Sequence, residues 1–114
     1  MARPAKGSGA ATLRTALLVL LSDRESHGYD LALRLAPFGI EPDMAGLYRT
    51  LRSMDRAGDL RSEWSTSSKG PARRVYGLTE EGRRRLQRAL DGMEAHHETV
   101  ERLLSHTRPG RVTR

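Results

Sequence analysis

The chain has 114 residues, enough for a single domain with one modest hydrophobic core. Lysine and arginine together number 20 against 14 acidic residues, a net charge of +6 that comes almost entirely from arginine. Such a balance favours a polyanionic partner, most often nucleic acid, with an acidic membrane surface as the rival. The chain has no cysteine, which excludes disulfides and thiolate metal sites.

Residues 1–11 combine proline, glycine and serine with basic side chains. We expect a disordered basic arm that either tracks phosphates or is simply solvated. The apolar run over residues 16–21 is far too short to span a bilayer, and Ser22–Glu25 is no small-residue cleavage site. These features indicate a cytoplasmic, nucleoid-associated protein with no membrane partner.

Two helices are predicted next, because apolar residues recur with helical spacing. The first spans residues 12–22 and must be covered on more than one side. Its apolar residues are Leu13, Leu17, Leu18, Val19, Leu20 and Leu21. The second runs from His27 to about Ala36 with Ser26 as its N-cap, and Gly28 within it is costly unless another backbone comes close. The residues expected to face inward are Tyr29, Leu31, Ala32 and Leu35.

Residues 43–58 predict a central helix with two unlike faces, capped by Asp43 and ended by Gly58. The apolar stripe consists of Leu47, Leu51 and Met54. The opposite side carries Ala45, Arg49, Arg52 and Arg56. With the preceding helix and the turn at Pro37–Pro42, this helix makes a helix-turn-helix.

The basic face of the central helix suits insertion into a DNA major groove. Ala45 and Gly46 would allow close approach, and Arg49 and Arg52 would read guanine or hold phosphate. Tyr48 lies beside this face, so its hydroxyl could reach a phosphate while its ring packs. A solvated amphipathic helix explains the helix alone equally well.

Two short strands follow, Leu60–Trp64 and Arg73–Leu78, around a polar loop at residues 65–72. A β-hairpin directly after a helix-turn-helix is the wing of a winged helix. It carries Lys69 at its tip and Arg73 and Arg74 at its base, and Lys69 and Arg73 could contact DNA phosphates. The alternatives are a surface linker for the loop and a solvated strand edge for Arg73 and Arg74.

A long last helix is predicted over residues 80–106, capped by Thr79 and followed by a disordered basic tail at 107–114. Its apolar side follows a 4-3-4-3-4 heptad spacing through Leu86, Leu90, Met93, His97, Val100 and Leu104. A helix this long cannot be covered by so small a domain, so we expect the stripe to pack against a second subunit. Packing along the first helix of the same subunit is the alternative, and both can occur.

Other chemistry finds little support in the sequence. His97 could meet its symmetry mate as a metal or pH site, but a hydrogen-bonded interface histidine is the preferred interpretation. Trp64 is expected in the core beneath the wing rather than at the mouth of an interface pocket. There is no clustered catalytic set and no phosphate-cradling glycine-rich loop, so we expect no enzyme activity, no metal and no cofactor.

Several short motifs follow one another in a fixed order over residues 13–86. They are His27-Gly28-Tyr29-Asp30-Leu31, Gly46-Leu47-Tyr48, Asp59-Leu60, Ser62-Glu63-Trp64, Arg74-Val75-Tyr76 and Leu78-Thr79-Glu80-Glu81-Gly82. Together they resemble the PadR family of winged-helix transcriptional regulators, in its short branch with one C-terminal helix. The chain departs from the family's usual Ser or Thr before the Leu-Tyr pair and its frequent Pro after it, and has Asp43, Met44, Ala45 and Arg49 there. The DNA sequence read by other members therefore cannot be transferred.

Residues and resemblance together predict a mainly α protein with a small β-hairpin: a winged helix-turn-helix at residues 12–79 and a dimerisation helix at 80–106. The resemblance implies a homodimeric repressor that binds double-stranded DNA sequence-specifically. Some family members release DNA when a small molecule binds at the dimer interface, but nothing in composition or periodicity indicates an effector here. The alternative is a winged-helix protein–protein interaction module without sequence-specific DNA binding, which would not need outward arginines and a basic wing.

Overall fold

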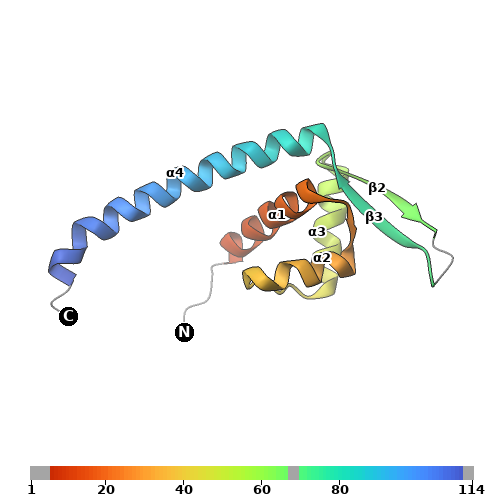
Figure 1. The fold of residues 1–114 in the computed structure, drawn as a ribbon, viewed down its shortest axis with the longest axis horizontal. Helices are drawn as coiled ribbons and strands as arrows, with labels where there is room; N and C mark the ends of the chain where they lie inside the picture. Colours follow the sequence, from red (N-terminus) through yellow and green to blue (C-terminus); the bar gives the residue numbers. More distant parts are fainter. Residues whose placement is uncertain (1–5, 67–69, 112–114) are drawn as a thin grey trace.

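The computed structural model describes residues 6–66 and 70–111, and the side chains of residues 9–66 and 70–107. The elements in chain order are α1 (Lys6–Asp23), β1 (Ser26–His27), α2 (Gly28–Leu35), the 3-10 helix η1 (Ala36–Phe38), α3 (Met44–Arg56), β2 (Leu60–Ser65), β3 (Arg73–Leu78) and α4 (Glu80–Arg111). Helices α1, α2 and α3 form a compact group beside the sheet, and α4 leads away from it (Figure 1). The predicted winged helix-turn-helix with a long C-terminal helix is confirmed.

The core lies where α1, α2, α3 and the base of the sheet meet. It contains Leu17, Leu18, Leu20, Leu21, Leu31, Leu35, Leu47, Leu51, Met54, Leu60, Tyr76 and Leu78. Four leucines of α1 belong to it, which confirms that this helix is covered on more than one side. Helix α1 begins at Lys6, six residues before the predicted start at Thr12. Ala10 and Ala11 are strong helix formers that extend the helix backwards, so residues 6–11 are helical and not part of an arm.

The start of α2 differs from the prediction. The N-cap is His27 and not Ser26, because the Nδ1 atom of His27 accepts a hydrogen bond from the backbone N–H of Asp30 at 3.2 Å. Ser26 and His27 form the short strand β1, which the sequence analysis did not predict. Leu31 and Leu35 are buried as expected, but the prediction for Tyr29 is wrong, since that side chain is 57% exposed.

Helix α3 follows its sequence pattern closely. Asp43 caps it by accepting a hydrogen bond from the backbone N–H of Gly46 at 3.2 Å. All three residues of the predicted apolar stripe are buried. Gly58 takes the left-handed conformation, with φ of 90°, in the turn that follows.

The sheet has three antiparallel strands in the order β1-β3-β2. Leu60 pairs with Leu78, Ser62 with Tyr76 and Trp64 with Arg74, so these six side chains share one face. The base of this face packs on the helices, but the hairpin extends past them (Figure 1). Trp64 therefore lies on the predicted side of the sheet with no core beneath it. It is 62% exposed, which corrects the core assignment.

Helix α4 is anchored at its first turn. Thr79 caps it as predicted, because its hydroxyl oxygen accepts from the backbone N–H of Gly82 at 2.9 Å. Gly82 lies against the backbone of Asp59, where a Cβ atom would collide with the carbonyl group. Arg85 forms an ion pair of 2.8 Å with the buried carboxylate of Asp59. These contacts fix the direction in which α4 leaves the domain.

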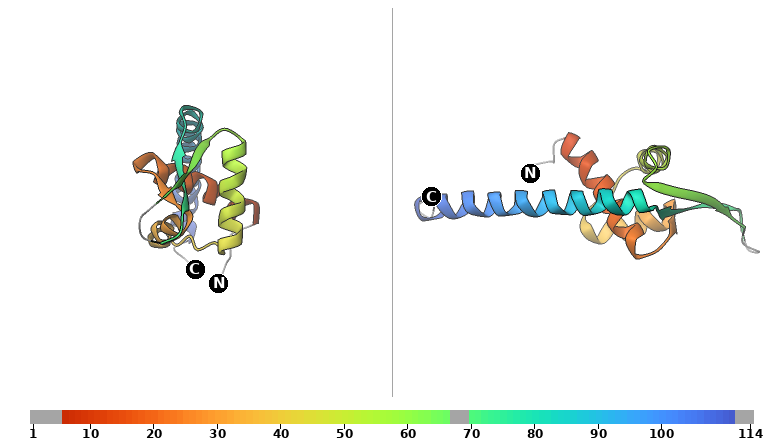
Figure 2. Two further views of the ribbon diagram at one scale, coloured as in Figure 1. Left: turned by 90° about the vertical axis from the view of Figure 1, so that its right-hand side faces the viewer. Right: turned by 90° about the horizontal axis from the view of Figure 1, so that it is seen from above.

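The remainder of α4 is a long arm. Its N-terminal part packs against α1, and its C-terminal part projects beyond the other elements (Figure 2). The helix continues to Arg111 instead of ending near His106, so residues 107–111 are helical and not part of a tail. The hydroxyl of Thr107 donates to backbone carbonyls of the preceding turn. No helix in the described ranges has the length and apolar character needed to cross a membrane.

Candidate nucleic-acid interface

The outer face of α3 is basic and open. Ala45, Arg49 and Arg52 are all exposed, as the helical spacing predicted. Gly46 is half-buried, and a Cβ atom on it would lie 2.6 Å from the capping carboxylate oxygen of Asp43. The absence of a side chain at Gly46 therefore serves the helix cap as well as the openness of this face.

Tyr48 joins α3 to the start of α2. Its ring is half-buried and packs against the core. It also fills the space over Gly28, where a Cβ atom would lie only 2.8 Å from the Tyr48 hydroxyl oxygen. The sequence analysis expected another backbone close to Gly28. Instead, the side chain of Tyr48 takes up the space that a Cβ atom would need.

A cleft of about 570 Å³ opens between the start of α2, α3 and the helix-facing side of the wing. Its lining residues are His27, Gly28, Tyr29, Tyr48, Arg52, Trp64, Ala72, Arg73, Arg74 and Tyr76. Three are arginines and none is aspartate or glutamate, so the described lining carries positive charge and no carboxylate. Burial raises the pKa of the Tyr76 hydroxyl at the floor of the cleft, so that residue stays neutral.

The cleft gathers residues that were predicted separately and adds others. Tyr48, Arg52 and Arg73, expected to contact DNA, meet there, whereas Ala45 and Arg49 lie outside it on α3. Arg74 was placed on the basic wing and Trp64 in the core, but neither was predicted as a DNA contact; the guanidinium of Arg74 stacks 5.3 Å from the centre of the Trp64 ring. The hairpin pattern could have predicted this pair, because residues directly opposite each other on paired strands have their side chains on the same face.

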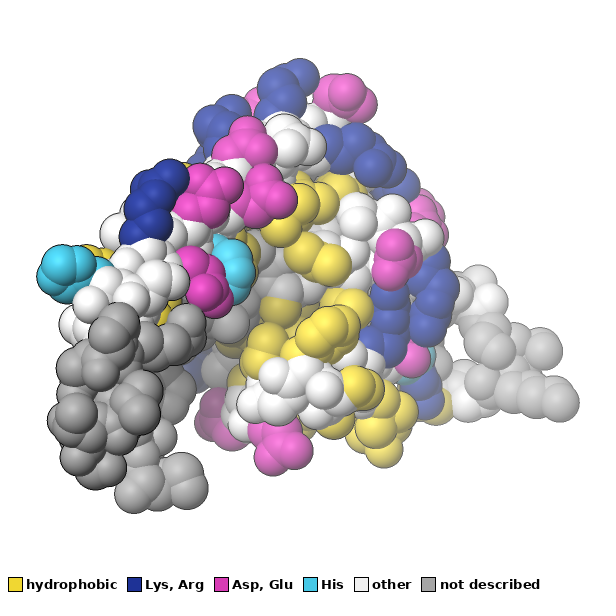
Figure 3. Space-filling model, turned by 60° about the vertical axis from the view of Figure 1, so that its left-hand side comes forward, with side chains coloured by type: hydrophobic (Ala, Val, Ile, Leu, Met, Phe, Trp, Pro, Cys, Tyr) yellow, Lys and Arg dark blue, Asp and Glu magenta, His cyan; other side chains and the backbone are white. Residues whose placement is uncertain are grey.

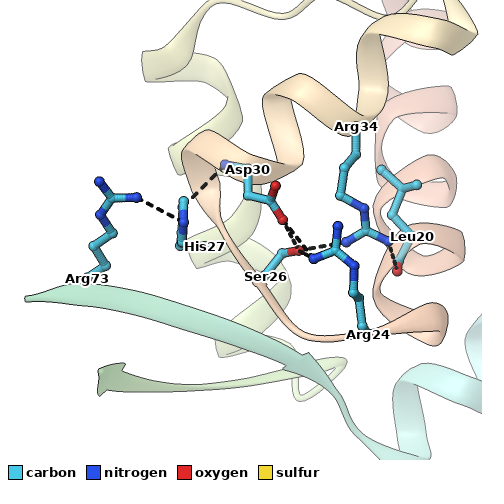
Figure 4. A network of polar contacts seen from close by, with 7 residues as sticks. All are labelled: Leu20, Arg24, Ser26, His27, Asp30, Arg34 and Arg73. Atoms are coloured by element: carbon cyan, nitrogen blue, oxygen red, sulfur yellow. Dashed lines mark hydrogen bonds and ion pairs between the residues drawn. The ribbon is translucent and has the colours of Figure 1, made fainter. Parts of the chain in front are cut away.

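A polar network behind the cleft holds α2 to the end of α1 (Figure 4). The Ser26 hydroxyl donates to the Asp30 carboxylate at 2.7 Å, and Arg24 pairs with the same carboxylate at 3.0 Å. Arg34 donates both to the Ser26 oxygen and to the backbone carbonyl of Leu20. The hydrogen bond from Ser26, helped by Arg24, lowers the pKa of Asp30. This network keeps the Asp30 charge neutralised and turned away from the cleft.

His27 stands between that network and the wing. Its Nδ1 atom caps α2, and its Nε2 atom lies 2.9 Å from Nη1 of Arg73 (Figure 4). Strand β1 ends at His27, so the edge of β3 is open beside Arg73. Neither periodicity nor composition indicated His27, because its position depends on pairing between segments distant in sequence. Lys69, expected at the wing tip, lies outside the described residues.

The heptad stripe of α4 starts on the domain and then leaves it. Leu86 packs against the core, whereas Leu90, Met93 and His97 are exposed. An apolar groove of about 180 Å³ lies between this part of α4, α1 and η1, and Figure 3 shows hydrophobic side chains gathered along this side. Its lining residues are Thr12, Thr15, Ala16, Val19, Leu20, Phe38, Ile40, Leu90 and Met93. Beyond it, His97 lies 3.9 Å from Glu101 on the same helix, and no group of three potential metal ligands occurs in the described part of the chain.

Comparison with known proteins agrees with this architecture. Residues 17–88 match the model of the transcriptional regulator PadR-like family, and no curated protein matches significantly. A conserved protein of unknown function, described as a potential transcriptional factor, is similar at 35% identity and TM-score 0.80, over 97% of this chain and 98% of its own. A PadR family transcriptional regulator from Eggerthella lenta is similar at 31% identity and TM-score 0.71, over 84% of this chain and 80% of its own.

Bacillus subtilis PadR, solved in complex with operator DNA, shares the fold at 22% identity and TM-score 0.64. That match covers 69% of this chain and 46% of the Bacillus subtilis chain. The family match spans well over half of the sequence and includes the helix-turn-helix, the wing and the first turns of α4. The chain therefore belongs to the PadR-like family of transcriptional regulators.

Proposed function

We propose that this protein is a homodimeric repressor that binds double-stranded DNA sequence-specifically through α3 and the wing. The observation that carries the proposal is the charge of one continuous surface. Arginines project from α3 and from the wing on either side of a cleft whose described lining holds no carboxylate. Such a surface matches a phosphate backbone and costs nothing in like-charge repulsion with it.

The proposed docking places α3 in the major groove. Arg49 and Arg52 reach base edges or phosphates, while Ala45 and the small Gly46 let the helix approach closely. Arg73 and Lys69 of the wing lie along the flanking backbone and contribute affinity without reading sequence. Bacillus subtilis PadR, which shares this fold and was solved in complex with operator DNA, supports DNA binding as the role of the fold.

The dimer is proposed to form along α4. Leu90 and Met93 of the stripe are 37% and 52% exposed, on an arm that the described part of the chain leaves largely uncovered. An isolated helix draws little stability from propensity alone, so the apolar stripe needs a partner surface. A second copy supplies the same stripe, as an isologous interface requires.

Repression and release complete the proposal. A dimer bound over a promoter excludes polymerase, and the family resemblance favours this sign of regulation. The groove between α1, η1 and α4 is the site we assign to a small apolar effector, because its described lining presents only apolar and threonine side chains. Its position beside the proposed seam would let a bound molecule alter the dimer geometry.

The DNA part is tested by binding to genomic fragments selected by the protein and then to the recovered operator. Arg49→Ala should weaken operator binding by about 1–3 kcal/mol and relax one position per half-site. Arg61→Ala is the control, because it removes the same charge from the base of the sheet, where Arg61 pairs with Glu25 at 2.9 Å. Equal, small effects of both variants would remove α3 as the reader. A wild type that binds no duplex would favour the protein–protein interaction alternative.

The dimer part is tested by light scattering at micromolar concentration. Leu90→Asp and Val100→Asp place charges in the seam and should split or unfold the dimer. Ala95→Asp is the matched control, since Ala95 is exposed and falls on the opposite side of α4 at 3.6 residues per turn. A monomeric wild type would refute the dimer.

A further inference from the structure

The contact between His27 and Arg73 contains a conflict of hydrogen-bond donors. The backbone N–H of Asp30 can only donate, so Nδ1 of His27, 3.2 Å away, must be its acceptor and carries no proton. A neutral imidazole has one donor and one acceptor nitrogen, so the proton is on Nε2. The guanidinium of Arg73 also has only donors, and its Nη1 lies 2.9 Å from that same Nε2.

The conflict cannot be resolved within the described side chains of this site. If Nε2 accepts from Arg73, the proton moves to Nδ1 and the cap of α2 is lost. If the cap is kept, two N–H groups face each other. The nearest carboxylate along α2, that of Asp30, is held by Ser26 and Arg24 on the other side of the helix start. None of the described cleft residues supplies an acidic group.

An anionic oxygen seated beside both nitrogens would satisfy all three groups at once. It would accept from Nε2–H of His27 and from Arg73, while Nδ1 keeps the cap of α2. The site lies on the open edge of β3, beside the cleft that runs from α3 to the wing. Charge-assisted hydrogen bonds from arginine to backbone phosphates are strong, and they carry no sequence information.

We propose that His27 and Arg73 form a two-donor clamp for one DNA backbone phosphate per half-site, with the α2 cap fixing the imidazole tautomer. This rests on the proposed DNA-binding function and names a contact within it. His27 acts as a direct ligand of the phosphate, and Asp30 acts as a positioning residue through its backbone N–H. The clamp pins the start of α2 and the loop end of β3 to the same strand of DNA.

Two substitutions separate the cap from the clamp. His27→Asn retains a side-chain oxygen suited to capping but lacks the Nε2 donor. His27→Gln retains a donor near the Nε2 position but caps poorly. His27→Asn should therefore bind operator and scrambled duplexes about tenfold more weakly at unchanged thermal stability. His27→Gln should lose stability and keep most of its affinity at a temperature where it is folded.

The salt dependence adds a second readout. Arg73→Ala should lower the slope of log affinity against log salt by about 1, because one phosphate is no longer neutralised. His27→Asn removes a hydrogen-bond donor but no arginine charge, so it should leave that slope at the wild-type value. Arg61→Ala, which removes a charge at the far end of the sheet, should leave affinity and slope unchanged.

A methylphosphonate scan of the operator identifies the phosphate. At one position per half-site, the neutral linkage should weaken wild type about tenfold and leave His27→Asn little further affected, because both changes remove the same contact. Wild-type affinity in His27→Asn, or equal losses in the Asn and Gln variants, would overturn the clamp. Weaker binding with no coupled position would show that His27 acts on DNA binding without contacting a phosphate, and this would also overturn the clamp. If Arg49→Ala still weakens operator binding in any of these cases, the proposed DNA-binding function stands even though the clamp is overturned.

Discussion

The ion pair between Asp59 and Arg85 offers a test of how the C-terminal helix is attached. Asp59 lies in the turn between α3 and β2 with its side chain only 2% exposed, and Nε of Arg85 approaches its carboxylate to 2.8 Å. The hydrogen bond and the charge of Asp59 raise the pKa of Arg85. Replacing Arg85 by alanine leaves a buried carboxylate without its cation.

The magnitude follows from the exposure of the two partners. Breaking a fully buried ion pair costs about 3–5 kcal/mol, whereas an exposed pair contributes about 0–1 kcal/mol. Asp59 is buried but Arg85 is 48% exposed, so water can approach the carboxylate once the guanidinium is removed. We therefore expect Arg85→Ala to lower the free energy of unfolding by about 2 kcal/mol, or Tm by roughly 8 °C for a domain of this size.

The assay is urea unfolding followed by circular dichroism at one fixed protein concentration, because a dimer's stability depends on concentration. Arg84→Ala is the matched control on the neighbouring position, where Arg84 and Glu81 form an exposed pair of 3.1 Å. That change should cost less than about 0.5 kcal/mol. The loss in Arg85→Ala should be constant from pH 5 to 9, since a raised arginine pKa gives stability that is lost only at much higher pH. Equal losses in the two variants would refute the buried-charge reasoning.

Three further predictions use other parts of the molecule. Because the pKa of Asp30 is lowered, its contribution to stability is present above its ordinary value of 3.8 and lost as pH falls below it, so Asp30→Asn should flatten the acid limb of the stability curve in urea titrations from pH 5 to 2. Gly28→Ala should destabilise by about 1–3 kcal/mol through contact with the Tyr48 ring, and adding Tyr48→Ala should remove that extra penalty in a double-mutant cycle. Trp64 is the only tryptophan and lines the cleft, so its fluorescence should change on addition of duplex DNA, and an unchanged spectrum at saturation would exclude the cleft from the interface.

Local patterns correctly predicted the elements that bury one face and expose the other. In α3, the spacing of Leu47, Leu51 and Met54 and the Asp43 cap were enough, because helix periodicity directly determines which side is buried. The two hairpin strands were predicted nearly to the residue, because turn-forming residues separate them. Helix ends were less accurate, since alanines before Thr12 and threonine at position 107 tolerate either state.

The features that the sequence did not predict depend on how segments distant in sequence are placed relative to one another. Trp64 was assigned to the core because alternation gives the side of the sheet but not how far the helices reach beneath it. Tyr29 was placed inward from the helical period of α2 alone. That period does not show that Tyr29 lines the open cleft beside the wing. The pairs His27–Arg73 and Asp59–Arg85 join residues 46 and 26 positions apart, and no local signal connects them.

The turn after α3 relates the proposed DNA-reading face to the proposed dimer seam. Asp59 accepts hydrogen bonds on its backbone carbonyl from the backbone N–H and the hydroxyl of Thr79, and its carboxylate holds Arg85. Gly82 lets the first turn of α4 lie directly against the same carbonyl. The chain thus attaches α4 to the end of α3 at its backbone and at a buried charge. In a dimer formed along α4, this attachment would set the distance and angle between the two α3 helices, and hence the half-site spacing. A variant that loosens it should therefore tolerate altered spacings better than one that weakens a base contact, even when both have the same affinity for the natural operator.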